Sequence, residues 1–177
     1  MPRSARLALI LAGLAGAAAP AAAQEFQPPE SHAASGGGSG MKVDLLGFSS
    51  RVGIDVTHGG AVVLGSAVDI AELGSPRVRL RPSFEYSGTG SVTSLHLATE
   101  IIYRFQPDRA PAIPYLGLGA GYYAPSAGSD KLWLNVVMGF ELAFRPSFNW
   151  LIEYHSLDRL RRHRFLIGLS TRGTGND

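Results

Sequence analysis

The chain has 177 residues, a formal net charge of +2, 17% charged residues and no cysteine. The absence of cysteine excludes disulfide scaffolds, thiolate metal sites and cysteine nucleophiles, and the small net charge argues against a nucleic-acid-binding protein. The mean hydropathy is +0.08, yet no run of about 18 apolar residues follows the N-terminal region. This combination is typical of apolar residues dispersed in alternation, as in a membrane β-barrel.

The first 23 residues have the three parts of a secretory signal peptide. Arg3 and Arg6 precede an apolar region at residues 7–18 and an alanine-rich cleavage site at residues 21–23. The apolar region is too short for a membrane-spanning helix. We therefore expect an exported protein whose mature chain begins after the cleavage site.

Residues 24–41 are rich in Pro, Ser and Gly, which predicts a flexible linker, and residues 173–177 form a polar tail. Between them, residues 42–172 divide into eight segments of alternating apolar and polar residues, separated by clusters of Gly, Pro, Asn and Asp. This is the weak, repeated signal of an up-and-down β-barrel. In chain order the segments are approximately residues 42–56, 61–73, 78–86, 95–105, 114–123, 132–145, 150–155 and 164–172.

Residues 132–145 show the alternation most clearly. Every second residue from Leu132 to Phe144 is apolar, whereas the other row includes Asn135 and Glu141. The segment exceeds the ~5–6 residues usual for soluble strands and covers the ~9–11 residues needed to cross a bilayer at a tilt. The sequence thus predicts an all-β fold, an eight-stranded antiparallel up-and-down transmembrane β-barrel, with a soluble sandwich or a periplasmic lipocalin-like binding barrel as alternatives.

Two segments contain residues that are unusual in strands. Pro82 lies inside the third segment, where a closed sheet has no edge to accommodate its missing N–H, so we expect a β-bulge there. In the fifth segment Gly117, Gly119 and Gly121 would line one face. In a narrow barrel such a face leaves room for large side chains opposite.

The outward aromatic residues fall at two heights if the chain starts in the periplasm and successive strands alternate in direction. The periplasmic level holds Tyr103, Phe105, Phe144, Phe148 and Trp150, and the outer level holds Phe84, Tyr86, Tyr122, Tyr154 and Phe165. Two such levels match the aromatic girdles of a membrane barrel. They favour the membrane interpretation over a soluble barrel.

The inward rows contain nearly balanced charges. These residues are Arg51, Asp55, Asp69, Arg79, Arg81, Glu85, Glu100, Arg104, Glu141, Glu153, Arg164 and Arg172. Because a buried unpaired charge costs several kcal/mol, we expect these residues to pair across strands. Eight strands enclose an interior just wide enough for side chains to fill, so the sequence predicts a non-conducting lumen.

The PYLGLGAGYY segment at 114–123, strand ends with Phe and Arg, and the RPSFNW turn at 145–150 resemble small eight-stranded outer-membrane barrels of the OmpA-like and OmpX-like type. The resemblance covers residues 42–172. It implies the outer membrane of a Gram-negative cell, contact with its lipid, and delivery by periplasmic chaperones and the barrel-assembly machinery. Such barrels usually end in an aromatic residue, whereas this last strand runs into STRGTGND at 170–177.

Glu153, His155 and Ser156 invite comparison with lipid A deacylase barrels, which resemble this chain in size and carry a Ser, His and Glu triad. Nucleophilic catalysis needs the hydroxyl, the imidazole and the acid in one hydrogen-bonded row. Neighbouring strand residues point to opposite faces, so His155 and Ser156 fit such a row poorly. We therefore expect no enzyme, with a lipid A acyl hydrolase as the alternative, and no metal or cofactor.

Residues 158–164, DRLRRHR, lie in the predicted last outer loop. Arg159, Arg161 and Arg162 suit bidentate binding of phosphate, and we expect them to contact lipopolysaccharide, with a merely solvated loop tip as the alternative. The predicted function is a structural or surface-interaction role in the cell envelope.

Overall fold

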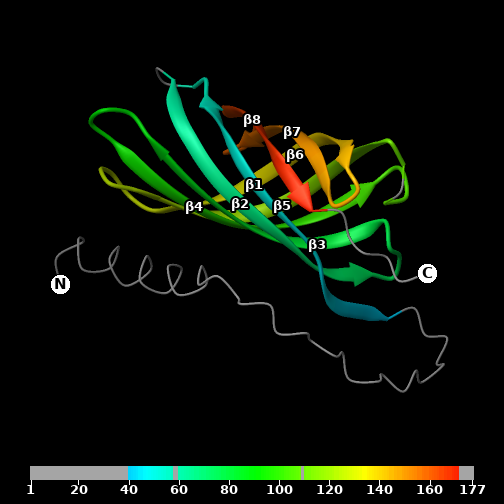
Figure 1. The fold of residues 1–177 in the computed structure, drawn as a ribbon. Helices are drawn as coiled ribbons and strands as arrows, with labels where there is room; N and C mark the ends of the chain where they lie inside the picture. Colours follow the sequence, from blue (N-terminus) through cyan, green and yellow to red (C-terminus); the bar gives the residue numbers. More distant parts are fainter. Residues whose placement is uncertain (1–39, 58–59, 109, 172–177) are drawn as a thin grey trace, which may run out of the picture. The chain divides into compact units, whose positions relative to one another are not determined.

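The computed structural model describes residues 40–57, 60–108 and 110–171, which form a closed antiparallel barrel (Figure 1). Its eight strands are β1 (Met41–Asp55), β2 (Ala61–Leu73), β3 (Val78–Gly88), β4 (Thr93–Arg104), β5 (Ala112–Pro125), β6 (Lys131–Arg145), β7 (Phe148–Leu157) and β8 (Arg162–Thr171). Each strand pairs with the next, and β1 closes the sheet on β8. The predicted eight-stranded up-and-down fold is confirmed.

Several predictions on the chain ends lie outside the described residues. These are the signal peptide, nearly all of the linker at 24–41, Arg172 and the polar tail. No helix in the described part of the chain has the length and apolar character to span a bilayer.

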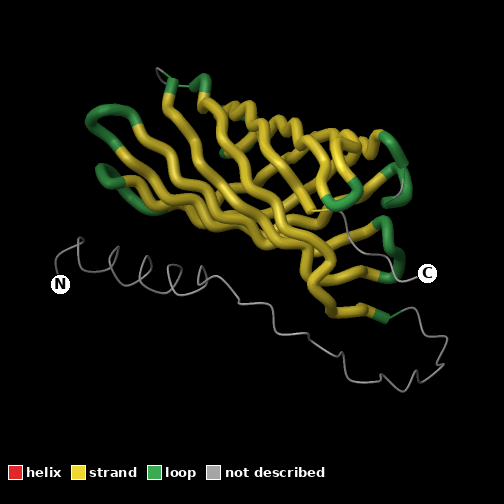
Figure 2. The backbone as a smooth tube through the Cα atoms, viewed as in Figure 1, coloured by secondary structure: helices red, strands yellow, loops and turns green. Residues whose placement is uncertain are grey.

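All connections between strands are short, as Figure 2 shows in green. At one end, here called the mouth end, they are residues 56–60, 89–92, 126–130 and 158–161. At the other end, here called the terminal end because β1 begins and β8 finishes there, they are residues 74–77, 105–111 and 146–147. No connection between the described strands is therefore long enough to cover either end of the barrel.

Burial in the barrel is the reverse of that in a water-soluble protein. On β6 the outward Leu132 is 79% exposed and Leu134 is 64% exposed, whereas the inward Asn135 and Glu141 are buried. Arg164, on the inward row of β8, is completely buried. The period-2 alternation read from the sequence thus places apolar side chains outside and charged side chains inside.

The bulge expected at Pro82 is confirmed. The register between β2 and β3 shifts between Ala67 and Ala71, which pair with Ser83 and Leu80 on either side of the proline. Towards β4, Pro82 pairs with Thr99 without interruption. The extra residue lies on β2, where residues 68–70 face Arg81 and Pro82. The ladder is therefore interrupted opposite the proline, which is how this closed sheet accommodates a residue without an N–H.

The glycines of β5 make room for large neighbours, as predicted. A Cβ at Gly117, Gly119 or Gly121 would collide with Ile102, Glu100 or His96 of β4, respectively. On β6 a Cβ at Gly139 would collide with the ring of Tyr115. At these four positions glycine therefore leaves the space that a large inward side chain of the neighbouring strand occupies.

Outward aromatic rings meet near both ends of the barrel. Near the terminal end, Phe144 and Trp150 have ring centroids 5.3 Å apart, and Tyr103 also contacts Phe105. Towards the mouth end, Tyr154 and Phe165 lie 5.2 Å apart. The pairs correspond to the two levels expected from the sequence.

Candidate functional site: the lumen and its mouth

A continuous chain of charged side chains runs along the lumen from the terminal end to the mouth. Consecutive contacts within 4 Å join Asp108, Arg104, Glu141, Arg81, Glu153, His155, Glu85, Arg164 and Asp55. Nearly all of these residues come from the inward rows of different strands. Ion pairs therefore fill the lumen from the terminal end as far as Asp55, near the mouth.

In the terminal half, Glu141 is the shared acceptor. Its Oε2 accepts hydrogen bonds from Arg104 Nη2 at 2.9 Å and from Asn149 Nδ2 at 3.0 Å. Arg81 donates from Nε to Asp69 at 2.6 Å, and its Nη2 lies 3.8 Å from Glu141. The opening left beside these residues is about 10 Å³, which is room for about one water molecule.

Glu153 lies at the centre and is completely enclosed. It forms ion pairs with Arg51 and, at 3.1 Å, with Arg81. It also accepts a hydrogen bond from the hydroxyl of Tyr115 at 2.5 Å and lies 3.1 Å from the Nε2 of His155. The side chains of four residues, Arg51, Arg81, Tyr115 and His155, therefore contact the carboxylate of Glu153.

In the mouth half, Glu85 links His155 to Arg164. The Nδ1 of His155 lies 3.0 Å from Glu85, and the Nη1 of Arg164 lies 2.5 Å from it. Arg164 also donates from Nε to Asp55 at 3.1 Å. The second oxygen of Asp55 accepts the backbone N–H of Thr57 at 3.0 Å.

Glu100 differs from the expectation that every inward charge is paired. Its side chain is buried, its Oε1 receives a long hydrogen bond of 3.4 Å from Ser83, and no cationic group of another described residue lies within 4 Å of it. Its charge acts on Arg51 only over a longer distance. Arg51 is held instead by Glu153 and His155. Arg79, in contrast, pairs with Asp69 of the neighbouring strand at 3.4 Å, and also with Asp108 at 2.6 Å.

The lumen residues predicted from charge do not include the uncharged and weakly basic members of the network. Tyr115, His96, His155, Asn135 and Asn149 are all buried on inward rows. The two histidines and two asparagines share the alternation parity of the charged residues of their own strands. Tyr115 lies on β5, which has no charged residue, and shares the parity of Gly117, Gly119 and Gly121. Alternation parity therefore identifies the lining where charge alone does not.

The structure does not place Glu153, His155 and Ser156 in one catalytic row. Both ring nitrogens of His155 face carboxylates, those of Glu153 and Glu85. Ser156 belongs to the other row of β7, where its register partners are Val136 and His163, and its Oγ has no hydrogen-bond partner among the described residues. In the described structure this hydroxyl forms no hydrogen bond with an imidazole, and the Nδ1 of the neighbouring His163 lies 2.7 Å from the hydroxyl of Tyr154 instead.

The arginines of residues 158–164 separate into three environments. Arg159 and Arg161 are exposed in the turn, where Asp158, Arg159 and Leu160 have φ values of 49°, 56° and 67°. Arg164 is buried in the lumen. Arg162 was predicted to lie in the loop, but it is the first residue of β8 and its guanidinium lies inside the mouth.

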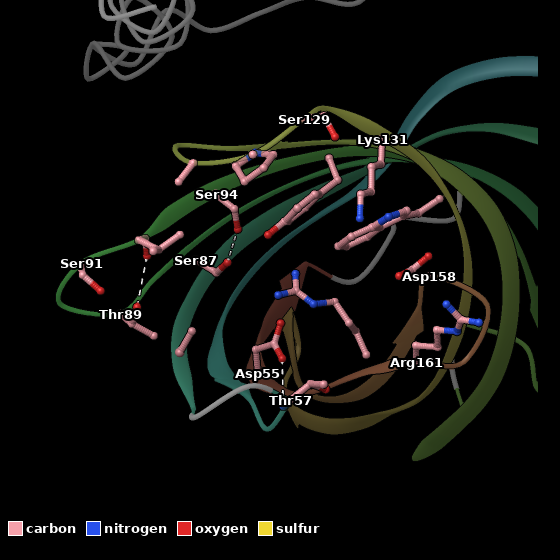
Figure 3. A pocket seen from close by; sticks show the side chains of 18 residues that line it. Asp55, Thr57, Ser87, Thr89, Ser91, Ser94, Ser129, Lys131, Asp158 and Arg161 are labelled. Atoms are coloured by element: carbon pink, nitrogen blue, oxygen red, sulfur yellow. Dashed lines mark hydrogen bonds between the residues drawn. The ribbon is translucent and has the colours of Figure 1, made fainter.

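The mouth end contains a cavity of about 800 Å³, here called the mouth cavity (Figure 3). The rings of Tyr123 and Trp133 stack at its wall with centroids 3.9 Å apart. The guanidinium carbon of Arg162 lies 5.0 Å and 5.1 Å from these two ring centroids, in the range of cation–π contacts. Among the described residues, no group of His, Asp and Glu could hold a metal ion.

These features define a class: a closed eight-stranded barrel with an apolar exterior and a charge-filled interior. No family model and no curated protein matches the chain. Among solved structures, Neisserial surface protein A (NspA) is similar, with a TM-score of 0.56 and 13% identity over 75% of this chain and 99% of that chain. The N-terminal β-barrel domain of Pseudomonas aeruginosa OprF gives a TM-score of 0.57 and 13% identity over 72% and 97%. At this identity the likeness shows a shared fold.

Proposed function

We propose that this chain is an outer-membrane protein of the small OmpA-like and OmpX-like barrel type, with a sealed lumen and a structural or surface-interaction role. The observation that carries the proposal is the inverted burial. Outward residues such as Leu118, Leu132 and Leu134 are more than 60% exposed, while the interior holds the charges. Water would not tolerate so large an apolar surface, whereas a bilayer matches it.

The backbone supports the same proposal. A bilayer offers no hydrogen-bond partners, so a spanning sheet must be closed, and β1 closes on β8 here. The strands have 10 to 15 residues, which covers the ~9–11 needed to cross at a tilt. A lipocalin-like carrier would need an apolar cavity inside the barrel, and the charges occupy that space.

The sealed lumen follows from the chain of ion pairs between Asp108 and Asp55. Each arginine along it contacts at least one carboxylate within 4 Å, so an ion would have to displace paired, buried charges to pass. The proposed barrel is therefore not a general pore.

Cell fractionation and gel mobility test the membrane proposal. We expect the protein in the outer-membrane fraction, migrating faster on a gel before boiling than after it, because a closed ladder resists detergent until heated. Recovery from the soluble periplasmic fraction, or identical migration with and without boiling, would contradict the proposal.

We further propose that Arg159 and Arg161 contact the phosphates of lipopolysaccharide. Both are exposed on the turn between β7 and β8, and a guanidinium offers phosphate a bidentate, charge-assisted bond. Because Arg162 lies in the mouth cavity, this contact no longer depends on it.

The test of this contact compares two double variants of equal charge. Arg159→Ser with Arg161→Ser should weaken co-purification with lipopolysaccharide at low salt, and added salt should weaken retention by the unmodified protein too. Arg77→Ser with Arg145→Ser removes two exposed arginines at the terminal end and should leave retention unchanged. If both double variants retain lipopolysaccharide equally, and both still show the heat-shifted band of a folded barrel, Arg159 and Arg161 are only solvated side chains of the turn.

We also propose that the chain does not hydrolyse lipid A through Ser156. The support is the engagement of both His155 nitrogens by carboxylates, which leaves the imidazole no free position beside a serine hydroxyl.

A further inference from the structure

The mouth cavity has the size of a small-molecule site. Its volume is about 800 Å³, within the ~300–1,000 Å³ usual for ligand pockets. It is lined by strand ends and by the short mouth-end connections and is open on one side, so a ligand could enter it from the mouth end. In Figure 3 Lys131 points from the start of β6 into this space.

The charged side chains of the cavity favour an anion. The lining includes three cationic residues, Lys131, Arg161 and Arg162, and two acidic ones, Asp55 and Asp158. Asp55 is already engaged, because it accepts hydrogen bonds from Arg164 and from the backbone of Thr57. Lys131 forms no ion pair with any residue that the structure describes.

Two buried donors near the stacked rings have no partner in the described structure. They are the Nε1 of Trp133, whose side chain is 4% exposed, and the Nη1 of Arg162. Buried donors in native proteins are nearly always satisfied. The cation–π contacts of Arg162 hold its guanidinium over Tyr123 and Trp133, so this donor is fixed in place before a ligand arrives.

Hydroxyl groups make up much of the remaining polar lining. They belong to Thr57, Ser87, Thr89, Ser91, Ser94 and Ser129. A hydroxyl both donates and accepts hydrogen bonds, which suits a ligand that itself carries many hydroxyls. The pair of Ser87 and Ser94, 2.6 Å apart, shows that these groups already exchange hydrogen bonds with one another.

We propose that the mouth cavity binds an anionic sugar, a sugar with a phosphate or carboxylate group. Arg162 and Lys131 hold the anionic group, and the serine and threonine hydroxyls bind the sugar hydroxyls. This site shares Arg161 with the proposed lipopolysaccharide contact, but it depends on Arg162 and Lys131, which that contact does not use.

Trp133 supplies a built-in reporter for binding. The chain has two tryptophans, and Trp150 lies on the outward face, so Trp150→Phe leaves Trp133 as the single emitter. The full chain is folded without lipopolysaccharide in lauryldimethylamine oxide micelles, which contain neither sugar nor phosphate. We expect glucose 6-phosphate to change the Trp133 emission saturably, with a Kd about tenfold or more below those of glucose and inorganic phosphate.

Matched variants locate the site. In the Trp150→Phe background, Arg162→Gln and Lys131→Gln should each weaken binding of glucose 6-phosphate about tenfold or more. Arg159→Gln, on the exposed turn outside the cavity lining, should leave the Kd unchanged. Lys131 is exposed at a strand end, so its variant tests the proposal even if Arg162→Gln fails to fold.

A parallel titration with lipopolysaccharide distinguishes a free sugar from a lipid headgroup. A response to lipopolysaccharide alone that Lys131→Gln weakens would support the site and assign it to the headgroup sugar. Absence of a saturable response to either ligand, with the sugar phosphate tested to about 10 mM, would overturn the proposal. An unchanged Kd in both Arg162→Gln and Lys131→Gln would overturn it as well.

Discussion

Glu153→Gln tests whether the ion pairs at the centre of the lumen stabilise the fold. The substitution keeps the size of the side chain and removes one negative charge. Arg81 would keep Asp69 and Glu141 as partners. Arg51, however, has no carboxylate other than Glu153 within 4 Å among the described residues, so it would lose its direct partner and keep only the more distant charges of Glu85 and Glu100.

Removal of one partner from a buried ion pair typically costs about 3–5 kcal/mol. Because Arg81 retains two carboxylates and Gln can still accept the hydrogen bond of Tyr115, we expect the lower end, about 3 kcal/mol. The measurement is the free energy of unfolding from urea titrations in lipid vesicles, followed by tryptophan fluorescence.

Glu100→Gln is the matched control. Glu100 is as deeply buried as Glu153, yet it forms no ion pair within the described structure and contacts Ser83 at 3.4 Å. Loss of its charge should change the free energy of unfolding by less than about 1 kcal/mol, or even increase it, because an unpaired buried charge is itself unfavourable. Equal losses in the two variants, or a neutral Glu153→Gln, would refute the argument that pairing, and not burial alone, determines the cost.

Four further predictions follow from the same structure. Glu141→Ala should lower the free energy of unfolding by about 3–5 kcal/mol, because Arg104 loses a buried partner; a neutral substitution in urea titrations would refute that pairing. Gly139→Val should lower the free energy of unfolding by about 1–3 kcal/mol, because the added side chain displaces the ring of Tyr115. An unchanged free energy of unfolding would mean that Tyr115 can move aside without cost. The purified protein should show no steady nanosiemens conductance in planar bilayers, whereas open-channel currents would contradict a sealed lumen. Lipid A from overexpressing cells should keep its number of acyl chains; the loss of one chain that is reversed by Ser156→Ala would reveal a hydrolase.

Strand number and the facing of side chains could be predicted from the sequence because alternation is a local property. The second strand was expected at residues 61–73 and is found at Ala61–Leu73. Strand ends were less accurate. Residues 146–149 were expected to turn, but β7 begins at Phe148, which pairs with Arg145 across a turn of two residues. Backbone pairing continues past the last clear alternation because hydrogen bonds of the ladder do not depend on side-chain polarity.

The partners within the lumen could not be predicted in the same way. Arg51 and Glu153 are 102 residues apart and lie on strands that are not neighbours in the sheet. The contact between these two residues depends on closure of the barrel and on the stagger of its strands. The local alternation of apolar and polar residues predicts neither. Glu100 illustrates the limit: its parity identified it as inward, but nothing in the sequence indicated that it would be left without an ion pair.

Arg162 shows most clearly what the local sequence pattern could not predict and only the tertiary structure determined. The amino-acid sequence places it within an arginine-rich stretch that looks like one loop, and its alternation with Arg164 gives only its parity. In the structure three consecutive left-handed residues confine the turn to residues 158–161. β8 therefore begins at Arg162, directly after the turn, and the side chain of Arg162 enters the mouth. The stacked rings that it contacts come from β5 and β6. Closure brings those strands within reach of β8, because a closed sheet turns every inward row towards a common axis.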